Sequence, residues 1–155
     1  MKYANAIVAF FLRLGLPMGR QALLTVPGRK TGLPRTTPVA LNRAGDGWWL
    51  ISVYGEVDWV KNLRAAGSAQ ITRRGRNSPV TVRELTSEQA APLVRDLVGS
   101  IGFVVRSVIG SQFPTDPGAP SQAWVDEARQ HPTFLLTPDP TTPGRRRRRE
   151  VDEGA

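Results

Sequence analysis

Two strand-like segments joined by a cationic turn constrain the fold of this chain more than any other feature. Residues 22–26 are apolar and partly β-branched, which is typical of a buried strand. A Pro-Gly pair and a Gly-Leu-Pro triplet within residues 27–34 are turn signals. Residues 36–41 resume a strand pattern, and Pro38 predicts a sheet edge or a bulge because proline has no N–H to donate. The stretch therefore predicts a strand, a turn and a second strand.

The turn carries three fixed positive charges, on Arg29, Lys30 and Arg35. A glycine-bearing turn lets backbone N–H groups approach an anion, and Arg and Lys add charge-assisted hydrogen bonds. These residues predict an anion site suited to a phosphate or to a chain of carboxylates. The alternative is an ordinary solvated hairpin tip, which has the same composition.

The next segment predicts a third strand and a short helix. Residues 48–54 are mainly apolar and end at Gly55, whereas residues 59–66 have helical spacing. Asp58 is expected to cap the start of this helix, and Gly67 is expected to end it.

The motifs GRKTGLPRTTPV (residues 28–39) and YGEVDWVKNLRAAG (residues 54–67) resemble the deazaflavin-dependent nitroreductase family. The resemblance covers residues 5–136. It implies a mainly β fold with helices (α+β), a split β-barrel of the FMN-binding split-barrel type with an N-terminal helix. It also implies an oxidoreductase that uses coenzyme F420, an 8-hydroxy-5-deazaflavin with a phosphate and a polyglutamate tail.

The resemblance further implies which residues bind the cofactor. Arg29, Lys30, Thr31 and Arg35 are expected to meet the phosphate and the glutamate tail. The expected contacts of the deazaflavin are Thr36, Thr37, Pro38, Val39 and Ala40 beneath it, Ile51, Ser52, Val53 and Tyr54 beside it, and Trp59, Val60, Lys61 and Asn62 on the helix that closes the site. No catalytic residue is assigned.

This chain departs from the resembling family in its supply of proton donors. Nitro- and quinone-reducing members have a lysine where this chain has Tyr54, a longer loop after it, and tyrosines in the C-terminal third. Here the only tyrosines are Tyr3 and Tyr54. Phe113 or Trp124 would serve as walls of the site, but neither side chain is a useful proton donor. Tyr54 is therefore expected either to act near the ring or to pack there.

The expected function is hydride transfer from reduced F420 to an apolar small-molecule acceptor, which is a quinone, an activated alkene or a nitro compound. Two alternatives stay open. One is a non-catalytic split barrel that binds a lipid or a fatty acid, and the other is a relative that uses FMN. The physiological acceptor, the direction of the reaction and the oligomeric state also stay open.

The net charge of +8 indicates an anionic partner. Five arginines at residues 145–149 against three acids give the tail +2, so the rest of the chain carries +6. No nucleic-acid partner is expected, because the arginine run lies in a tail without aromatic side chains. One histidine and no cysteine leave little for a metal site and are compatible with a reducing cytoplasm, the expected location.

Residues 3–14 predict a helix whose apolar run is interrupted at Arg13 and is too short to cross a bilayer. This helix packs on the barrel or makes peripheral contact with the inner face of the cell membrane. The expected organisation is an N-terminal amphipathic helix at 1–20, a split β-barrel cofactor-binding domain at 21–137, and a disordered Pro/Arg-rich tail at 138–155.

The remaining patterns predict strands at 69–74, 79–85 and 134–137, a turn at 75–78, and helices capped by Thr86 and by Ser121. Residues 99–109 are apolar and either continue the first of these helices or cover the barrel mouth. His131 is expected to make local hydrogen bonds rather than to act as a catalyst.

Overall fold

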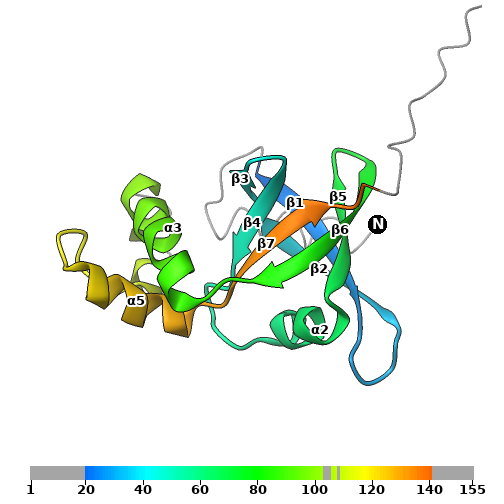
Figure 1. Ribbon diagram of the computed structural model, residues 1–155, viewed down its shortest axis with the longest axis horizontal. Helices are drawn as coiled ribbons and strands as arrows, with labels where there is room; N and C mark the ends of the chain where they lie inside the picture. The colour runs from blue at the N-terminus through cyan, green and yellow to red at the C-terminus, as the bar shows by residue number, and fades with distance from the viewer. Residues whose placement is uncertain (1–19, 103–105, 108, 141–155) are drawn as a thin grey trace, which may run out of the picture.

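The structure is a computed structural model that describes residues 20–102, 106–107 and 109–140. The expected N-terminal helix and the Pro/Arg-rich tail therefore lie almost wholly outside the described residues. Within them, seven strands and three α-helices form an α+β fold (Figure 1). No helix in this part of the chain is long and apolar enough to cross a bilayer.

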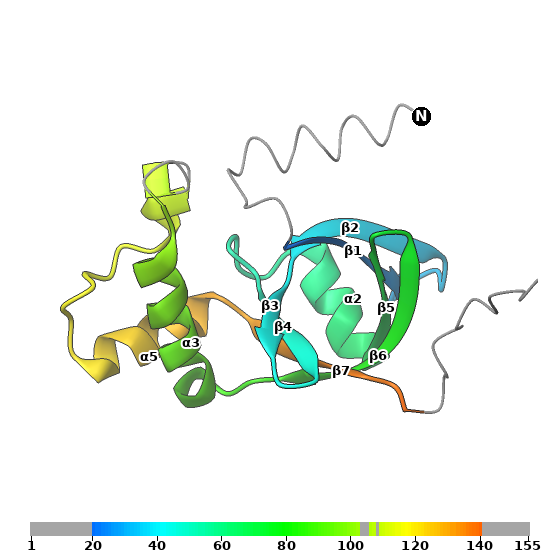
Figure 2. The same cartoon turned by 90° about the horizontal axis from the view of Figure 1, so that it is seen from above.

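The elements follow in the order β1 (Gln21–Pro27), β2 (Pro34–Ala40), β3 (Asn42–Ala44), β4 (Gly47–Ile51), α2 (Asp58–Ala66), β5 (Ser68–Arg73), β6 (Arg76–Glu84), α3 (Ser87–Ser100), the 3-10 turn η1 (Gly110–Gln112), α5 (Ser121–Gln130) and β7 (Thr133–Pro138). The strands form one sheet in the order β2-β1-β5-β6-β7-β4-β3, and every neighbouring pair is antiparallel. Figure 2 shows that the sheet curls around α2, whereas α3 and α5 lie together beyond β3 and β4. This half-barrel confirms the expected split-barrel fold.

The curled sheet and α2 enclose the first of two apolar cores. In β1 the buried residues Ala22, Leu24 and Val26 alternate with more exposed ones, as a strand with one face in the core requires. Val60 and Leu63 of α2 close the barrel from its concave side and are each 0% exposed. Burying such a side chain stabilises the fold by roughly 1.5–3 kcal/mol.

A second apolar core joins α3 to α5. Its buried members are Ala90, Ala91, Val94, Val98, Ile109, Phe113, Trp124 and Ala128. Thr86 starts α3 with a full capping box: the Thr86 hydroxyl accepts from the Gln89 backbone N–H at 3.2 Å, and the Gln89 side chain accepts from the Thr86 N–H at 3.1 Å. The expected cap is confirmed.

The β1–β2 hairpin has the predicted form. Its strands pair from Gln21 with Ala40 to Pro27 with Pro34, and β2 lies at one end of the sheet, so Pro38 occupies an edge strand as expected. The connecting loop is closed by a hydrogen bond from the Gly28 N–H to the Leu33 carbonyl at 2.8 Å.

Three local expectations were wrong. The strand expected to reach Tyr54 ends at Ile51, because the backbone turns after Ser52, whose hydroxyl donates to the Gly55 carbonyl. The turn between β5 and β6 is shorter than 75–78, because β6 already begins at Arg76. Asp58 and Ser121 are the first residues of α2 and α5 rather than their caps, and neither cap position makes a side-chain hydrogen bond.

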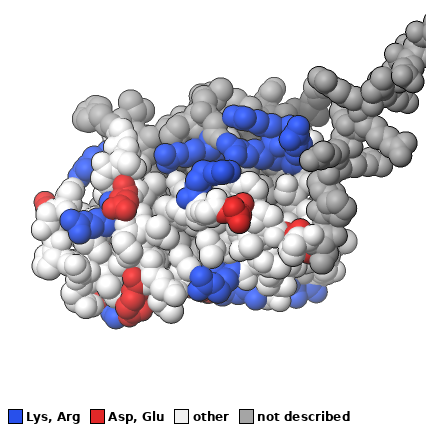
Figure 3. Space-filling view, turned by 45° about the horizontal axis from the view of Figure 1, so that its top comes forward, with Lys and Arg blue, Asp and Glu red and all other residues white. Residues whose placement is uncertain are grey.

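Basic side chains are not spread evenly over the surface. Figure 3 shows Lys and Arg gathered on the face that carries the β3–β4 hairpin and the β5–β6 turn. This distribution agrees with the positive net charge of the chain.

Candidate functional site

A largely apolar cavity of about 350 Å³ lies between the sheet and the C-terminal end of α3. This volume is within the range of sites that hold a small molecule or a cofactor ring. Nine of the residues expected to contact a ring line it: Thr37, Pro38, Val39, Ala40, Ile51, Ser52, Val53, Tyr54 and Trp59. The structure thus brings together segments that are separate in the sequence.

Sequence reasoning missed the rest of the cavity lining, which is Arg20, Asn42, Val57, Leu97, Ser100, Ile101, Gly102 and Ile109. One signal for it was present: the apolar stretch 99–109 was expected either to continue a helix or to cover the barrel mouth. Ile101 and Ile109 from this stretch form part of the cavity wall.

The β2 strand offers a backbone edge to this cavity. Within the described chain β2 pairs only with β1, so its other edge is not used in the sheet. Such an edge presents N–H and C=O groups that a planar heterocycle can bind. Pro38 has no N–H, so it interrupts the row of donors along this edge and disfavours pairing with another strand.

The segment after β4 is held rigidly against the cavity. The Ser52 N–H donates to the Pro132 carbonyl at 2.9 Å, and the Ser52 hydroxyl donates to the Gly55 carbonyl at 2.6 Å. Gly55 has φ 76°, a left-handed conformation that favours glycine. Tyr54, at the tip of this turn, is 53% exposed at the cavity rim.

The buried side chain of His131 contacts the turn that follows β4. The Nδ1 of His131 lies 3.1 Å from the Ser52 carbonyl oxygen, and its Nε2 lies 2.9 Å from the Gln112 carbonyl oxygen and 3.1 Å from the Glu127 carboxylate. The side chains of His131 and Glu127 are only 4% and 2% exposed. Both ring nitrogens face oxygen atoms, so the imidazole ring is held in place from both sides.

The histidine cluster extends into the loop before α5. Glu127 also accepts hydrogen bonds from the backbone N–H of Thr115, at 3.1 Å, and from its hydroxyl. The Phe113 ring stacks on the imidazole with centroids 4.3 Å apart. His131 does not line the cavity, which agrees with the expected local hydrogen-bonding role.

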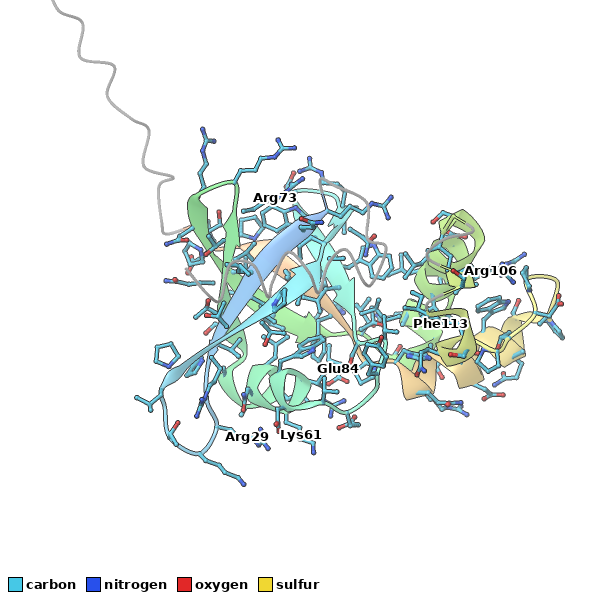
Figure 4. All side chains as sticks on the ribbon, turned by 180° about the vertical axis from the view of Figure 1, so that it is seen from behind. Arg29, Lys61, Arg73, Glu84, Arg106 and Phe113 are labelled. Carbon is cyan, nitrogen blue, oxygen red and sulfur yellow. The ribbon has the colours of Figure 1, made fainter. Side chains whose placement is uncertain are left out.

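The cationic loop lies at the Pro34 end of β2 and is hydrogen-bonded to α2 through Arg29. The Arg29 guanidinium donates to Asn62 Oδ1 at 2.9 Å and to Asp58 Oδ1 at 3.2 Å, and the Arg29 backbone N–H donates to the same Asn62 oxygen at 3.1 Å. Asn62 is 6% exposed. Figure 4 shows Arg29 and Lys61 at the same end of the molecule. Arg29 is therefore held in place before any ligand arrives.

The expected site residues thus divide into two groups. Nine line the cavity, whereas Arg29, Lys30, Thr31, Arg35, Thr36, Val60, Lys61 and Asn62 do not. Among these eight, Val60 is fully buried in the barrel core and Asn62 binds Arg29, so neither faces the cavity. Lys30, Thr31 and Arg35 are exposed on or beside the loop.

The cavity residues Thr37 to Ala40 and the cationic loop lie toward opposite ends of β2. β2 has seven residues, so at roughly 3.3 Å per residue it spans about 20 Å. A ligand with an apolar ring at one end and an anionic chain at the other fits this arrangement. In the described part of the chain, no group of His, Cys, Asp or Glu side chains is placed to hold a metal ion.

Solved structures with TM-scores of 0.50 and 0.52 show the same fold, and a third has a lower score. An FMN-binding protein related to pyridoxamine 5'-phosphate oxidase, from Nostoc punctiforme, has a TM-score of 0.52 and 16% identity, covering 89% of this chain and 81% of its own. A candidate 5-nitroimidazole antibiotic resistance protein from Bacteroides thetaiotaomicron has a TM-score of 0.50 and 12% identity, covering 87% and 79%. An F420-H2 dependent reductase, FDR-A, has a TM-score of 0.46 and 22% identity, covering 77% and 95%.

The sequence itself matches one family model. No curated protein matches this chain significantly. The model of the F420H(2)-dependent quinone reductase family matches residues 11–103, which contain the cationic loop, β2, β4, α2 and α3. This match covers more than half of the 155 residues and confirms the expected deazaflavin-dependent relationship. The chain therefore belongs to the F420H2-dependent quinone reductase family, whose cofactor is coenzyme F420.

Proposed function

We propose that this protein transfers a hydride from reduced F420 to an apolar small molecule, with a quinone as the preferred acceptor and activated alkenes and nitro compounds as further candidates. The observation that carries the proposal is the placement of an apolar cavity and a cationic loop at opposite ends of one edge strand, which spans about 20 Å in all. When bound, reduced F420 supplies the hydride from C5 of its deazaflavin.

The residues of this chain fit a cofactor of that shape. Arg29, Lys30 and Arg35 offer positive charge and N–H donors to the phosphate and the glutamate tail, and the Thr31 hydroxyl adds a neutral O–H donor. The β2 edge at residues 36–40 would bind the polar edge of the deazaflavin. Ile51, Val53 and Trp59 would exclude water from its face, because their apolar side chains line the cavity.

The acceptor would lie between the deazaflavin and the end of α3. Leu97, Ile101 and Ile109 form an apolar wall there, which favours an apolar ring over a hydrated substrate. Tyr54 lies at the rim, where solvent also reaches, so either its hydroxyl or water can deliver the proton that completes reduction. We assign no catalytic side chain.

Titration with F420 tests the cofactor assignment. The variant Arg29→Ala, Lys30→Ala removes two charge-assisted interactions, each of which contributes about 1.5–3 kcal/mol, so F420 should bind at least about tenfold more weakly. A matched control, Arg76→Ala with Arg83→Ala, removes the same charge from β6 and should leave F420 binding unchanged.

Three outcomes discriminate the function classes. Oxidation of reduced F420 by a naphthoquinone supports the proposal. Tight FMN binding without F420 binding would instead assign a flavin relative. A co-purified acyl chain, with no turnover of reduced F420, would assign the non-catalytic lipid-binding alternative.

A cytoplasmic location, with peripheral contact at the inner membrane face, stays a prediction because residues 1–19 lie outside the described ones.

A further inference from the structure

A second pocket, of about 410 Å³, lies beside the apolar cavity. The two share four lining residues, Arg20, Asn42, Leu97 and Ser100. They are therefore adjoining compartments that share part of their lining. The second pocket is at the Ala40 end of β2, opposite the cationic loop, so it is distinct from the expected site of the cofactor tail.

The chemistry of the two compartments differs. The second pocket is lined by three arginines, Arg20, Arg43 and Arg73, and by one acidic residue, Asp96. Arg20 and Arg43 are exposed guanidinium groups in this lining and outnumber its one carboxylate, which suits an anionic group, because arginine binds carboxylate and phosphate oxygens through paired N–H donors. Figure 3 shows that basic side chains gather on this face of the molecule.

Arg20 stands at the junction of the two compartments. Its guanidinium donates to Asn42 Oδ1 at 3.2 Å, and both residues line both pockets. A guanidinium has five N–H donors, so the bond to Asn42 holds Arg20 in place and leaves donors for a ligand. A molecule lying in the apolar cavity would meet this charge at its far end.

We propose that the second pocket binds an anionic group, a carboxylate or a phosphate, carried by an acceptor whose apolar ring occupies the first cavity. The acceptor class is therefore an amphiphilic quinone-like molecule rather than an uncharged one. The prediction that such an acceptor is reduced rests on the proposed function. Binding of the acceptor can be measured without its reduction.

The test uses two probes that differ in one charge: a naphthoquinone with a short alkanoate side chain, and its methyl ester. Steady-state oxidation of reduced F420 is followed at low ionic strength. We expect the wild-type KM to be about threefold or more lower for the acid than for the ester, with similar kcat. Equal KM values for the two probes would overturn the inference.

Two variants that change the charge of the second pocket in opposite directions show whether the difference in KM arises there. Arg43→Gln should raise the KM of the acid about threefold, Asp96→Asn should lower it, and neither should alter the KM of the ester. Arg83→Gln, an exposed arginine on β6 outside the pocket, is the matched control and should change neither KM. The inference fails if Arg43→Gln and Arg83→Gln have the same effect on the acid.

Calorimetric titration of both probes, with oxidised F420 present, measures binding of the acceptor separately from its reduction. If neither probe is reduced, the proposed function fails, and acid-selective binding that Arg43→Gln weakens would still support the second pocket. A phosphonate analogue that binds more tightly than the ester also supports it. Inorganic phosphate that binds as tightly as the acid probe would assign a free-anion site and overturn the inference.

Discussion

The buried Glu127–His131 pair offers the sharpest test of how the site is supported. The variant Glu127→Gln keeps the size of the side chain but replaces one carboxylate oxygen with an NH2 group. One carboxylate oxygen accepts from Thr115 and the other lies 3.1 Å from His131 Nε2, so glutamine keeps an oxygen for only one of these two contacts. The side chains of Glu127 and His131 are 2% and 4% exposed, so water cannot replace the lost contact.

The expected loss can be derived from these contacts. Leaving a buried hydrogen-bonding group without its partner costs about 1–3 kcal/mol, and we expect the upper end, about 3 kcal/mol, because Glu127 contacts both Thr115 and His131. At about 2–4 °C per kcal/mol for a chain of this size, the melting temperature should fall by about 6–12 °C.

The assay is urea unfolding followed by tryptophan fluorescence, with Asp126→Asn as the control. Asp126 lies next to Glu127 on α5, but its ion pair with Arg129 is exposed and should contribute at most about 1 kcal/mol. We also expect weaker F420 binding in Glu127→Gln, because His131 positions the Ser52 turn at the cavity. Equal unfolding free energies for Glu127→Gln and Asp126→Asn would refute this reasoning.

Three further predictions follow from single contacts. Gly47→Ala should prevent stable folding or lower the melting temperature strongly, because the added Cβ would lie 2.0 Å from the Leu136 carbonyl oxygen. The control Gly99→Ala adds a Cβ with nothing within 4 Å and should be neutral or stabilising, and thermal melts compare the two variants. Tyr54→Phe should keep kcat within about threefold, because water reaches the exposed rim; a fall of about 100-fold would instead identify the hydroxyl as the proton donor. A hydrogen bond from Arg64 lowers the pKa of Glu56. The ionised carboxylate therefore stabilises the fold above the ordinary glutamate pKa of about 4.3, and this stabilisation is lost as the pH falls through the lowered pKa. In a plot of the urea unfolding midpoint against pH, Glu56→Gln should reduce the decline at acid pH.

Much of the fold was predictable because its signals are local. The Pro and Gly pattern around residues 27–34 marks a turn, and Pro38 marks an edge strand, because proline restricts the backbone in any context. The Thr86 capping box closes within one helical turn, so its residues suffice to identify it. Asp58 was misassigned for the opposite reason: its carboxylate binds Arg29, 29 positions earlier, instead of the helix N-terminus.

The candidate site was predictable only in part. The cavity residues of β2 and of the turn after β4 followed from the resemblance to a known family. That resemblance could not distinguish residues that face the cavity from those that face the core, and Val60 belongs to the core. Side-chain direction depends on how α2 is rotated against the sheet.

The sequence by itself determined the strand–turn–strand unit, the family and the positive charge of the loop, because each depends on residues that are close in the chain. Only the tertiary structure decided which groups share a compartment. His131 supports Ser52 across 79 positions, and Arg20 joins Leu97 in the lining that two pockets share. The physical reason is the curl of the sheet, which results from packing of many side chains at once and brings its distant segments to one cavity.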